Sequence, residues 1–415
     1  MPHHHPPQGP NRKARPGTVT AARGGLKLVV GGTRHVTGLV EALHGQVERL
    51  APPLRRVDAA GPPVRPDDSD GLPPTFGLTG LAYRGIQGSM RLVGDGLDGL
   101  LAPFDSALAS GEPSPRRDAL VAALNGVLGD HLVRSGNPLA IPLQLRQNGQ
   151  PLDAAALGPN APRRVLLLIH GLCMSDIGWR RNGHDHGELL GRALGAAPVY
   201  VFYNSGRHIS DNGRALADAL ERLLADWPVP LDEIMIVGHS MGGLVARSAL
   251  AQAAGQQWPQ KVRKLVFLGT PHHGAPLERA GNWLHRVMDM SPYVAPFTRL
   301  SRLRSEGITD LRHGNLLAAD WQGESRFNHA DRRTPVPLPA HLQAFAIAST
   351  AGAPGIAGSL LGDGLVPVDS ALGHHKRRAL DLGLPATHQW VGHGINHLDL
   401  LCDPVVYRKL LSWLT

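Results

Sequence analysis

The feature that most constrains this chain is an alternation of strand-length apolar runs with helical patterns, which begins after residue 139. The apolar runs are hydrophobic at nearly every position, as in strands that are buried on both faces. Such alternation is typical of parallel strands joined by crossover helices, so the sequence predicts an α/β fold with a doubly wound, mostly parallel sheet. The predicted strands span residues 165–169, 198–203, 233–237, 264–268 and 342–348, and the predicted helices include 212–224, 241–254 and 405–414.

A β-hairpin is predicted ahead of these strands, over residues 141–152. At its centre lies Asn148-Gly149, a pair that favours a type I′ turn because both residues tolerate positive φ. We therefore expect the chain to enter the sheet through an antiparallel pair of strands.

Three regions of the chain differ in pattern. Residues 1–23 are rich in Pro, Gly and Arg and predict a disordered tail, and residues 24–137 predict a helical N-terminal region with a Pro-rich linker. Residues 138–415 form the predicted α/β domain. Within that domain, residues 271–339 are an insertion with an amphipathic stretch around Trp283 and Val287. Insertions of this length inside a compact domain are usually functional, so we expect a lid or cap.

Charge and cysteine content narrow the partners and the location. The net charge is +8, but the basic clusters are short and lack interleaved aromatic residues, so no nucleic-acid partner is expected. The two cysteines, Cys173 and Cys402, make neither a disulfide framework nor a metal-ligand pattern. No signal peptide or transmembrane stretch is recognised. We expect a cytoplasmic protein of undefined oligomeric state, with peripheral contact between the N-terminal helices and a membrane as the alternative.

The segment Gly238-His239-Ser240-Met241-Gly242 matches the pattern G-x-S-x-G. A predicted strand ends just before it and a predicted helix begins just after it, which is the context of a nucleophile on a sharp strand-to-helix turn. A plain tight turn is the alternative. We favour the nucleophile, because the glycines leave room for a turn that lifts the serine hydroxyl above the sheet.

A serine nucleophile that transfers acyl groups also needs donors for the oxyanion. The backbone N–H of the residue after the serine, Met241, is one candidate. The second is the N–H of Leu172, because His170-Gly171-Leu172 directly follows the first parallel strand. His170 itself is expected to pack beneath this loop without a chemical role.

An acid and a base should follow the serine in the order Ser, Asp, His. Asp363, between two glycines, is favoured over Asp369, which is placed as well to cap a turn. For the base, the candidates are His388, His393 and His397. The last two both lie past the final strand, and spacing alone does not separate them.

These motifs resemble those of the bacterial true lipases and their esterase relatives in the α/β-hydrolase superfamily. The similar segments are GHSMGG at residues 238–243, DGLV at 363–366 and NHLD at 396–399. The C-terminal stretch and the insertion also resemble the PGAP1-like hydrolases. Since the lipases carry the catalytic acid in D-G-L-V and the histidine in N-H-L-D, the resemblance implies a triad of Ser240, Asp363 and His397.

The expected activity is that of an esterase or lipase, which cleaves small-molecule or lipid esters with apolar acyl groups through an acyl-enzyme on Ser240. An acyltransferase with the same triad is one alternative, and a catalytically inactive, membrane-associated binding protein is another. No cofactor is expected. The resemblance also raises a structural calcium at Asp399, but one carboxylate falls short of the six to eight oxygens that calcium takes. We favour an interaction of Asp399 with a helix dipole.

Overall fold

The computed structural model describes residues 114–274, 305–322, 333–352 and 362–415. Two compact units divide the chain, Met1–Gly111 and Glu112–Thr415, and every described residue belongs to the second. The predicted disordered tail, most of the predicted helical N-terminal region and much of the predicted lid lie outside the described residues. Among the described helices, none is both long enough and apolar enough to cross a membrane.

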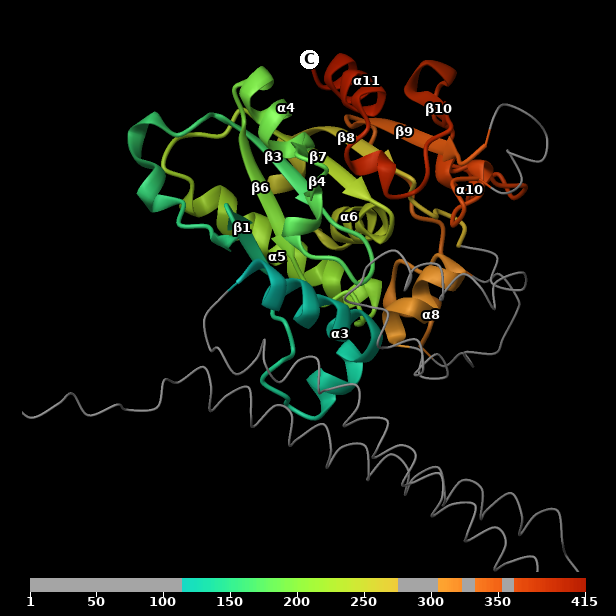
Figure 1. Ribbon diagram of the computed structural model, residues 1–415, viewed down its shortest axis with the longest axis horizontal. Coiled ribbons are helices and arrows are strands. Elements are labelled where there is room, and N and C mark those ends of the chain that lie inside the picture. Colours follow the sequence, from blue (N-terminus) through green and yellow to red (C-terminus); the bar gives the residue numbers. More distant parts are fainter. Residues whose placement is uncertain (1–113, 275–304, 323–332, 353–361) are drawn as a thin grey trace, which may run out of the picture. The chain divides into compact units, whose positions relative to one another are not determined.

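An eight-stranded sheet forms the centre of the second unit (Figure 1), with strand order β10-β9-β8-β7-β3-β6-β1-β2. Strands β3 and β6–β10 pair in parallel, whereas β1 is antiparallel to both β6 and β2. This arrangement confirms the predicted α/β fold. The strands are β1 (Gln144–Gln147), β2 (Gln150–Pro151), β3 (Arg164–Ile169), β6 (Ala197–Phe202), β7 (Glu233–His239), β8 (Val262–Leu268), β9 (Gln343–Thr350) and β10 (Gln389–His393), with β4 (Arg180–Arg181) and β5 (His184–Asp185) in a separate pair.

The antiparallel entry into the sheet is the predicted hairpin. Asn148 has φ 53° and Gly149 has φ 75°, and a type I′ turn requires positive φ at both central residues. The hairpin pairs Gln147 with Gln150 across this turn.

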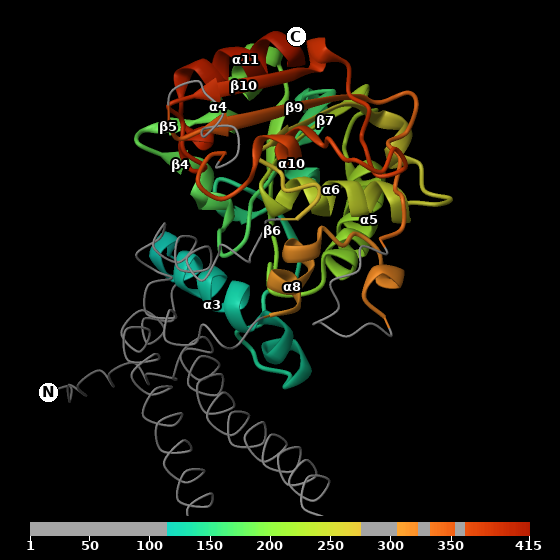
Figure 2. The ribbon, with the colours of Figure 1, turned by 90° about the vertical axis from the view of Figure 1, so that its right-hand side faces the viewer.

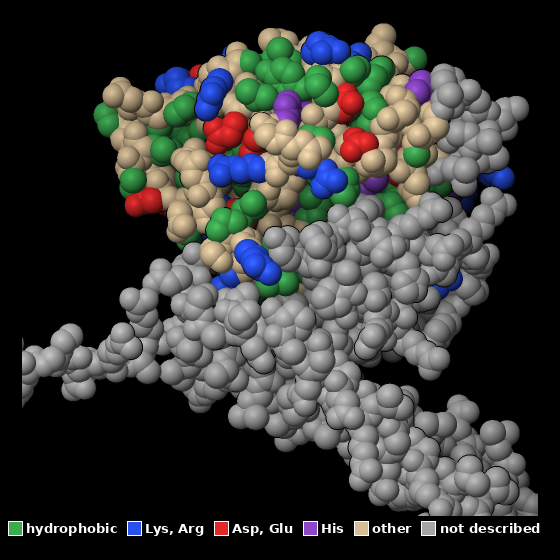
Figure 3. Space-filling view, viewed as in Figure 1, with side chains coloured by type: hydrophobic (Ala, Val, Ile, Leu, Met, Phe, Trp, Pro, Cys, Tyr) green, Lys and Arg blue, Asp and Glu red, His purple; other side chains and the backbone are tan. Residues whose placement is uncertain are grey.

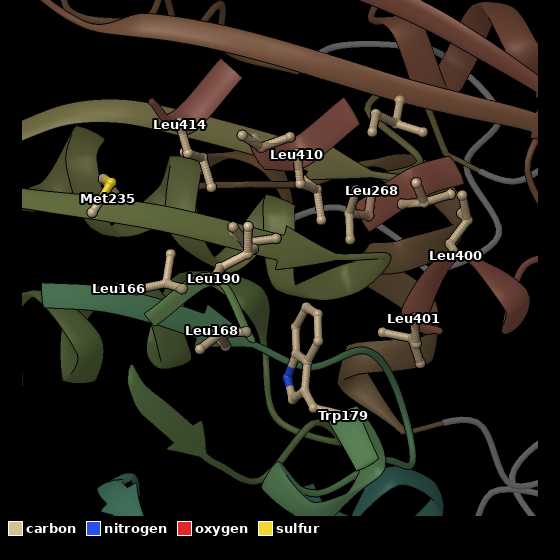
Figure 4. Packing of buried hydrophobic residues seen from close by; sticks show 14 of the residues in the cluster. Leu166, Leu168, Trp179, Leu190, Met235, Leu268, Leu400, Leu401, Leu410 and Leu414 are labelled. Atoms are coloured by element: carbon tan, nitrogen blue, oxygen red, sulfur yellow. The ribbon is translucent and has the colours of Figure 1, made fainter. Parts of the chain in front are cut away.

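Helices cover both faces of the sheet (Figures 1 and 2), with α4 and α11 on one face and α5 and α6 on the other. Leu190 of α4 and Leu410 of α11 share a buried cluster with Leu168 of β3 and Met235 of β7 (Figure 4). Burial on both faces explains why the parallel strands are apolar throughout. The described helices are α3 (Pro115–Arg134), α4 (His186–Leu194), α5 (Ile209–Asp226), α6 (Met241–Gln252), α8 (Glu306–His313), α10 (Val368–Leu372) and α11 (Pro404–Leu414).

Helix α3 belongs to the same compact unit as the sheet. The predicted boundary at residue 138 therefore differs from the structural one, which places this helix with the α/β domain. Small residues explain the close packing of α3: a Cβ on Gly126 would lie 2.8 Å from the Cα of Cys173. In addition, the side-chain amide of Asn204 donates to the carbonyl of Gly129 (3.1 Å).

The described part of the insertion is anchored to the beginning of α5. Asp310 of α8 is fully buried, and its carboxylate accepts hydrogen bonds from the backbone N–H of Ile209 (2.9 Å) and from Nδ1 of His208 (2.9 Å). The ring of His208 also stacks on Trp321 at a centroid distance of 3.7 Å. The first turn of α5 is therefore capped by a residue about one hundred positions away.

Lysine, arginine and acidic side chains are interspersed on the face shown in Figure 3, and the coloured surface there has no large patch of a single charge. This distribution is that of an ordinary solvated surface over the part of the chain that the figure colours.

Candidate active site

Ser240 lies at the turn between β7 and α6, where its backbone has φ 53° and ψ −125°. Positive φ is rare for a residue with a side chain and is a form of backbone strain that clusters at functional sites. The N–H of Ser240 donates to the carbonyl of Leu268 at the end of β8 (2.8 Å). This bond to the neighbouring strand helps to hold the strained turn at the carboxyl edge of the sheet.

The glycines around Ser240 are required by close backbone approach. A Cβ on Gly238 would lie 2.7 Å from the Cα of Gly243, and a Cβ on Gly242 would collide with the carbonyl oxygen of Ile169. Neither neighbour is a flexible side chain that could move aside. The glycine pattern in the motif therefore reflects the packing of α6 against β3 and against its own turn.

Asp363 and His397 form a buried pair beside this turn. Nδ1 of His397 donates to Oδ2 of Asp363 at 2.6 Å, and each residue is only 3% exposed. The other carboxylate oxygen, Oδ1, accepts from the backbone N–H groups of Leu365 and Val366, both at 2.9 Å. Both oxygens of the carboxylate are thus satisfied, and the imidazole is fixed with its Nδ1 proton toward the acid.

Gly269 shows how close the pair is to the serine. It follows Leu268, which holds the N–H of Ser240, and a Cβ on Gly269 would lie 3.1 Å from both Oδ2 of Asp363 and Cε1 of His397. The three residues are therefore gathered at the carboxyl ends of the strands, where open α/β sheets bind their ligands.

The competing candidates lie elsewhere. Nδ1 of His388 contacts the carbonyl of Ala344 and Nδ1 of His393 contacts Oγ1 of Thr350, each at 3.0 Å. The side chain of Asp369 is 85% exposed, in the first turn of α10. None of the three joins the Asp363–His397 pair.

His239 connects the turn to the histidine. Its ring is buried, and Nε2–H donates to the backbone carbonyl of His397 at 3.0 Å. Burial, together with the neighbouring His397, lowers the pKa of His239 well below its usual range, so the ring is neutral with its proton on Nε2. The residue that precedes Ser240 in the motif thus positions the backbone of His397.

The two predicted oxyanion donors lie on two segments next to Ser240, with Leu172 on the loop after β3 and Met241 at the start of α6. A Cβ on Gly171 would lie 3.0 Å from Cβ of Ser240. Leu172 therefore directly follows a residue that is in close contact with Ser240. Met241 begins α6, and neither its N–H nor that of Leu172 donates to a backbone carbonyl among the described residues. Both N–H groups thus remain candidates for binding an oxyanion.

Ser205 and Tyr203, which the sequence analysis did not single out, fix the shape of the loop that carries Leu172. The N–H of Cys173, which has φ 59°, donates to Oγ of Ser205 (3.0 Å). The hydroxyl of Tyr203 donates to the carbonyl of His170 (2.7 Å), and the two rings stack at 4.4 Å. Burial lowers the pKa of His170 to about 4, so this residue is a neutral structural support.

No group of three or more His, Cys, Asp or Glu side chains that could hold a metal ion is found within the described residues. Asp399 was the residue considered as a calcium ligand. Its Oδ2 accepts a hydrogen bond from the backbone N–H of Asn396 (3.3 Å). Asp399 lies in the first turn of a short 3-10 helix, Asp399–Leu401. Its described contacts are those of a local turn.

Part of the chain is similar to a known protein family. Residues 200–345 match the model of the PGAP1-like alpha/beta domain. A segment of 69 residues is 35% identical to a GPI inositol-deacylase of Emericella nidulans, covering 17% of this chain and 6% of that protein. The chain therefore spans only a small part of that relative's length.

Two solved structures are similar to this chain. The mature Bacillus licheniformis lipase BlEst2 is 18% identical, with 66% of this chain and 98% of that chain covered and a TM-score of 0.43. Aspergillus fumigatus lipase B is 13% identical, with 67% and 57% covered and a TM-score of 0.40. The family match is confined to residues 200–345 of the 415 in the chain, so this part of the α/β sheet domain is similar to the PGAP1-like alpha/beta domain.

Proposed function

We propose that this protein is a serine hydrolase that cleaves carboxylic esters with apolar acyl groups, with Ser240 as nucleophile, His397 as general base and Asp363 as the acid that orients it. The observation that carries the proposal is the 2.6 Å hydrogen bond between His397 and Asp363, buried beside a serine with positive φ. A turn without chemistry needs neither the strain nor the buried charge.

The reaction begins when the hydroxyl oxygen of Ser240 attacks the ester carbonyl and Nε2 of His397 accepts the hydroxyl proton. Asp363 stabilises the resulting imidazolium and itself stays deprotonated. The N–H groups of Leu172 and Met241 bind the oxyanion of the tetrahedral intermediate. His397 then gives its proton to the leaving alcohol, and the acyl group stays on Ser240 until water, activated by the same histidine, releases the acid.

Two observations support an acyl ester as the substrate. The relative in Emericella nidulans is named an inositol-deacylase, which specifies an acyl group as the part removed. The sequence of the insertion places Trp283, Leu284, Val287 and Met288 within six residues, a composition suited to contact with an apolar chain.

The proposal is tested with p-nitrophenyl esters of increasing acyl length, from acetate to palmitate, with the full-length chain. Wild-type protein is expected to turn over several of these esters, with kcat/KM higher for apolar chains longer than acetate. Ser240→Ala is expected to lower kcat on the order of 10⁵- to 10⁶-fold, since loss of the nucleophile disables the whole triad.

Labelling with a fluorophosphonate probe separates the nucleophile from other serines. We expect the probe on Ser240 in wild type, no label in Ser240→Ala, and full label and activity in Ser412→Ala, whose hydroxyl makes an exposed local bond to Lys409. An inactive, unlabelled wild type would overturn the proposal. Transfer of most of the acyl group to an added alcohol at low concentration would make acyl transfer the correct reaction.

A further inference from the structure

A cavity of about 300 Å³ lies beside the middle of α6 and shares no lining residue with the candidate triad. Arg247 lines it, seven residues and thus roughly 10 Å along the helix from Ser240. The other charged or titratable residues of the lining are His272, His273, Arg333, Arg378 and Asp381. Positive groups therefore outnumber the single acid in this cavity.

Arg247 is a buried cation with no counterion among the described residues. It is only 5% exposed, its Nη2 donates to the carbonyl of Val336 (2.9 Å), and its Nε–H has no partner among the described residues. No described carboxylate acts on its charge. Burial and the neighbouring Arg333 lower the pKa of Arg247 to about 10, so the guanidinium stays charged at neutral pH.

His272 adds a second unused donor. It is 1% exposed, and its Nδ1 lies 3.3 Å from Nη1 of Arg247. Since a guanidinium can only donate, Nδ1 must accept, and the proton of the imidazole is on Nε2. Burial and Arg247 lower the pKa of His272 well below its usual range. Nε2–H is thus a buried donor with no partner among the described residues.

The remaining charges do not neutralise Arg247. Arg333 donates Nη1–H to the carbonyl of His272 (3.0 Å), and Arg378 is an exposed residue of the lining. The carboxylate of Asp381 accepts from the backbone N–H groups of His375 (2.9 Å) and Gly383 (2.7 Å). These bonds hold the acid in its own turn, in the segment after α10.

A buried, unpaired guanidinium is costly, and buried charges in proteins are normally paired. An anion with several oxygens would accept from Nε–H of Arg247 and Nε2–H of His272 at once, and arginine suits such multidentate recognition of phosphate. We propose that this cavity binds an oxyanion of the phosphate class, either free phosphate or the phosphomonoester headgroup of a larger molecule. This binding site is separate from the ester-hydrolysing site and does not depend on its activity.

The proposal is tested by thermal unfolding and titration calorimetry of the full-length protein with inorganic phosphate, at constant ionic strength set with sodium chloride. Phosphate is expected to bind with one-site stoichiometry and to raise the melting temperature with increasing concentration, because it binds only the folded state. Glycerol 3-phosphate provides the second arm: tighter binding than phosphate indicates a headgroup, and weaker binding indicates the free ion. Equal stabilisation by acetate would overturn the proposal in favour of general charge screening.

Arg247→Met is the decisive variant. We expect its phosphate affinity to fall about tenfold or more, since hydrogen bonds to a charged group are lost. Its melting temperature without phosphate should be unchanged or higher, because an apolar side chain of similar length replaces an unpaired buried charge. Loss of folding in this variant would be separated from loss of binding by Arg378→Gln, which changes an exposed residue of the lining and should weaken binding without unfolding the protein.

Two control variants lie outside the cavity and test whether the response to phosphate is specific to it. Arg222→Met removes an equal charge from the exposed face of α5, and Ser240→Ala removes the proposed nucleophile. Both variants should keep the wild-type response to phosphate. A response that is unchanged in Arg247→Met, or lost in Arg222→Met, would show that phosphate does not bind in this cavity.

Discussion

Two buried polar pairs near α6 differ in one respect, which is whether the fold itself completes their hydrogen bonds. In the Asp363–His397 pair an anion meets a donor, and the two carboxylate oxygens accept three hydrogen bonds in total. In the Arg247–His272 pair both partners retain an N–H without an acceptor among the described residues. The first pair is complete within the protein, whereas the second keeps N–H donors that the proposed anion would satisfy.

The contrast teaches that burial alone does not define a catalytic pair. All four residues are at most 5% exposed. What separates the pairs is the sign of the charge and the supply of acceptors, because a buried charge is stable only when its partners are present. This difference predicts how substitutions in the two pairs should change activity and stability.

The largest expected effect is on catalysis. Asp363→Asn should lower kcat for ester hydrolysis by about 10⁴-fold, because the amide cannot hold the Nδ1 proton of the histidine in the same way. Steady-state kinetics with a p-nitrophenyl ester measures this, and circular dichroism checks that the variant is folded. Asp369→Asn is the matched control and should stay within about twofold of wild type, since that side chain is exposed. An inactive Asp369→Asn beside an active Asp363→Asn would reverse the assignment of the acid.

The next effect is on stability, where the two pairs should respond in opposite directions. Asp363→Ala removes the acceptor of three buried donors and should lower the free energy of unfolding by about 2–4 kcal/mol. Arg247→Met should change it by less than about 1 kcal/mol or raise it. Urea unfolding of both variants tests the contrast, which fails if the arginine variant is the less stable of the two.

A smaller effect is expected at His239, which connects the serine turn to the base. His239→Ala leaves the carbonyl of His397 without its donor, so we expect kcat to fall about tenfold with KM nearly unchanged. His239→Gln, which keeps an N–H donor, should recover part of the loss. A change confined to KM would indicate that His239 acts on substrate binding and not on the position of the base.

The smallest effect concerns His208, a half-buried histidine that lies beside two carboxylates. Burial opposes its charged form, but Asp310 and Glu306 outweigh this and raise the pKa of His208 above its usual range. A raised pKa in the folded state stabilises the protein fully below the unfolded pKa, and this stability is lost as pH rises through the folded pKa. The free energy of unfolding of the wild type should therefore fall more steeply from pH 6 to pH 8 than that of His208→Gln. Urea unfolding at each pH measures this. Parallel profiles would show that this ion pair contributes nothing.

The sheet was predictable because burial on two faces leaves a plain signal. The predicted strand at residues 165–169 corresponds to β3 (Arg164–Ile169), and the predicted strand at 342–348 corresponds to β9 (Gln343–Thr350). Helix α4 was not among the predicted helices, since its nine residues include Gly187 and Gly191, which favour a helix weakly. Both glycines pack closely, against Tyr200 and the carbonyl of Ala196.

The site was predictable only where a motif is local. The strand–serine–helix context indicated Ser240 from a dozen residues, but the choice of His397 over His393 depended on a resemblance. Both histidines were expected past the last strand, whereas the structure shows His393 as the last residue of β10 (Gln389–His393). The bond from His239 to His397 joins residues 158 positions apart, and the one from Arg247 to Val336 joins residues 89 apart. Such contacts follow from the three-dimensional arrangement of the strands, and no periodicity in the sequence reports them.

The docking of α3 has a consequence for the order in which this protein matures. The helix is synthesised before Asn204 and Ser305, and its bonds reach across 75 residues from Gly129 to Asn204 and across 179 from Gly126 to Ser305. Contacts this distant in the chain form late in folding. The loop that carries Leu172 packs against α3. This loop therefore has all of its supporting contacts only after residue 305 has left the ribosome. Pulse-labelled hydrogen exchange should find α3 protected after the central strands, which would place formation of the sheet before formation of the proposed oxyanion site.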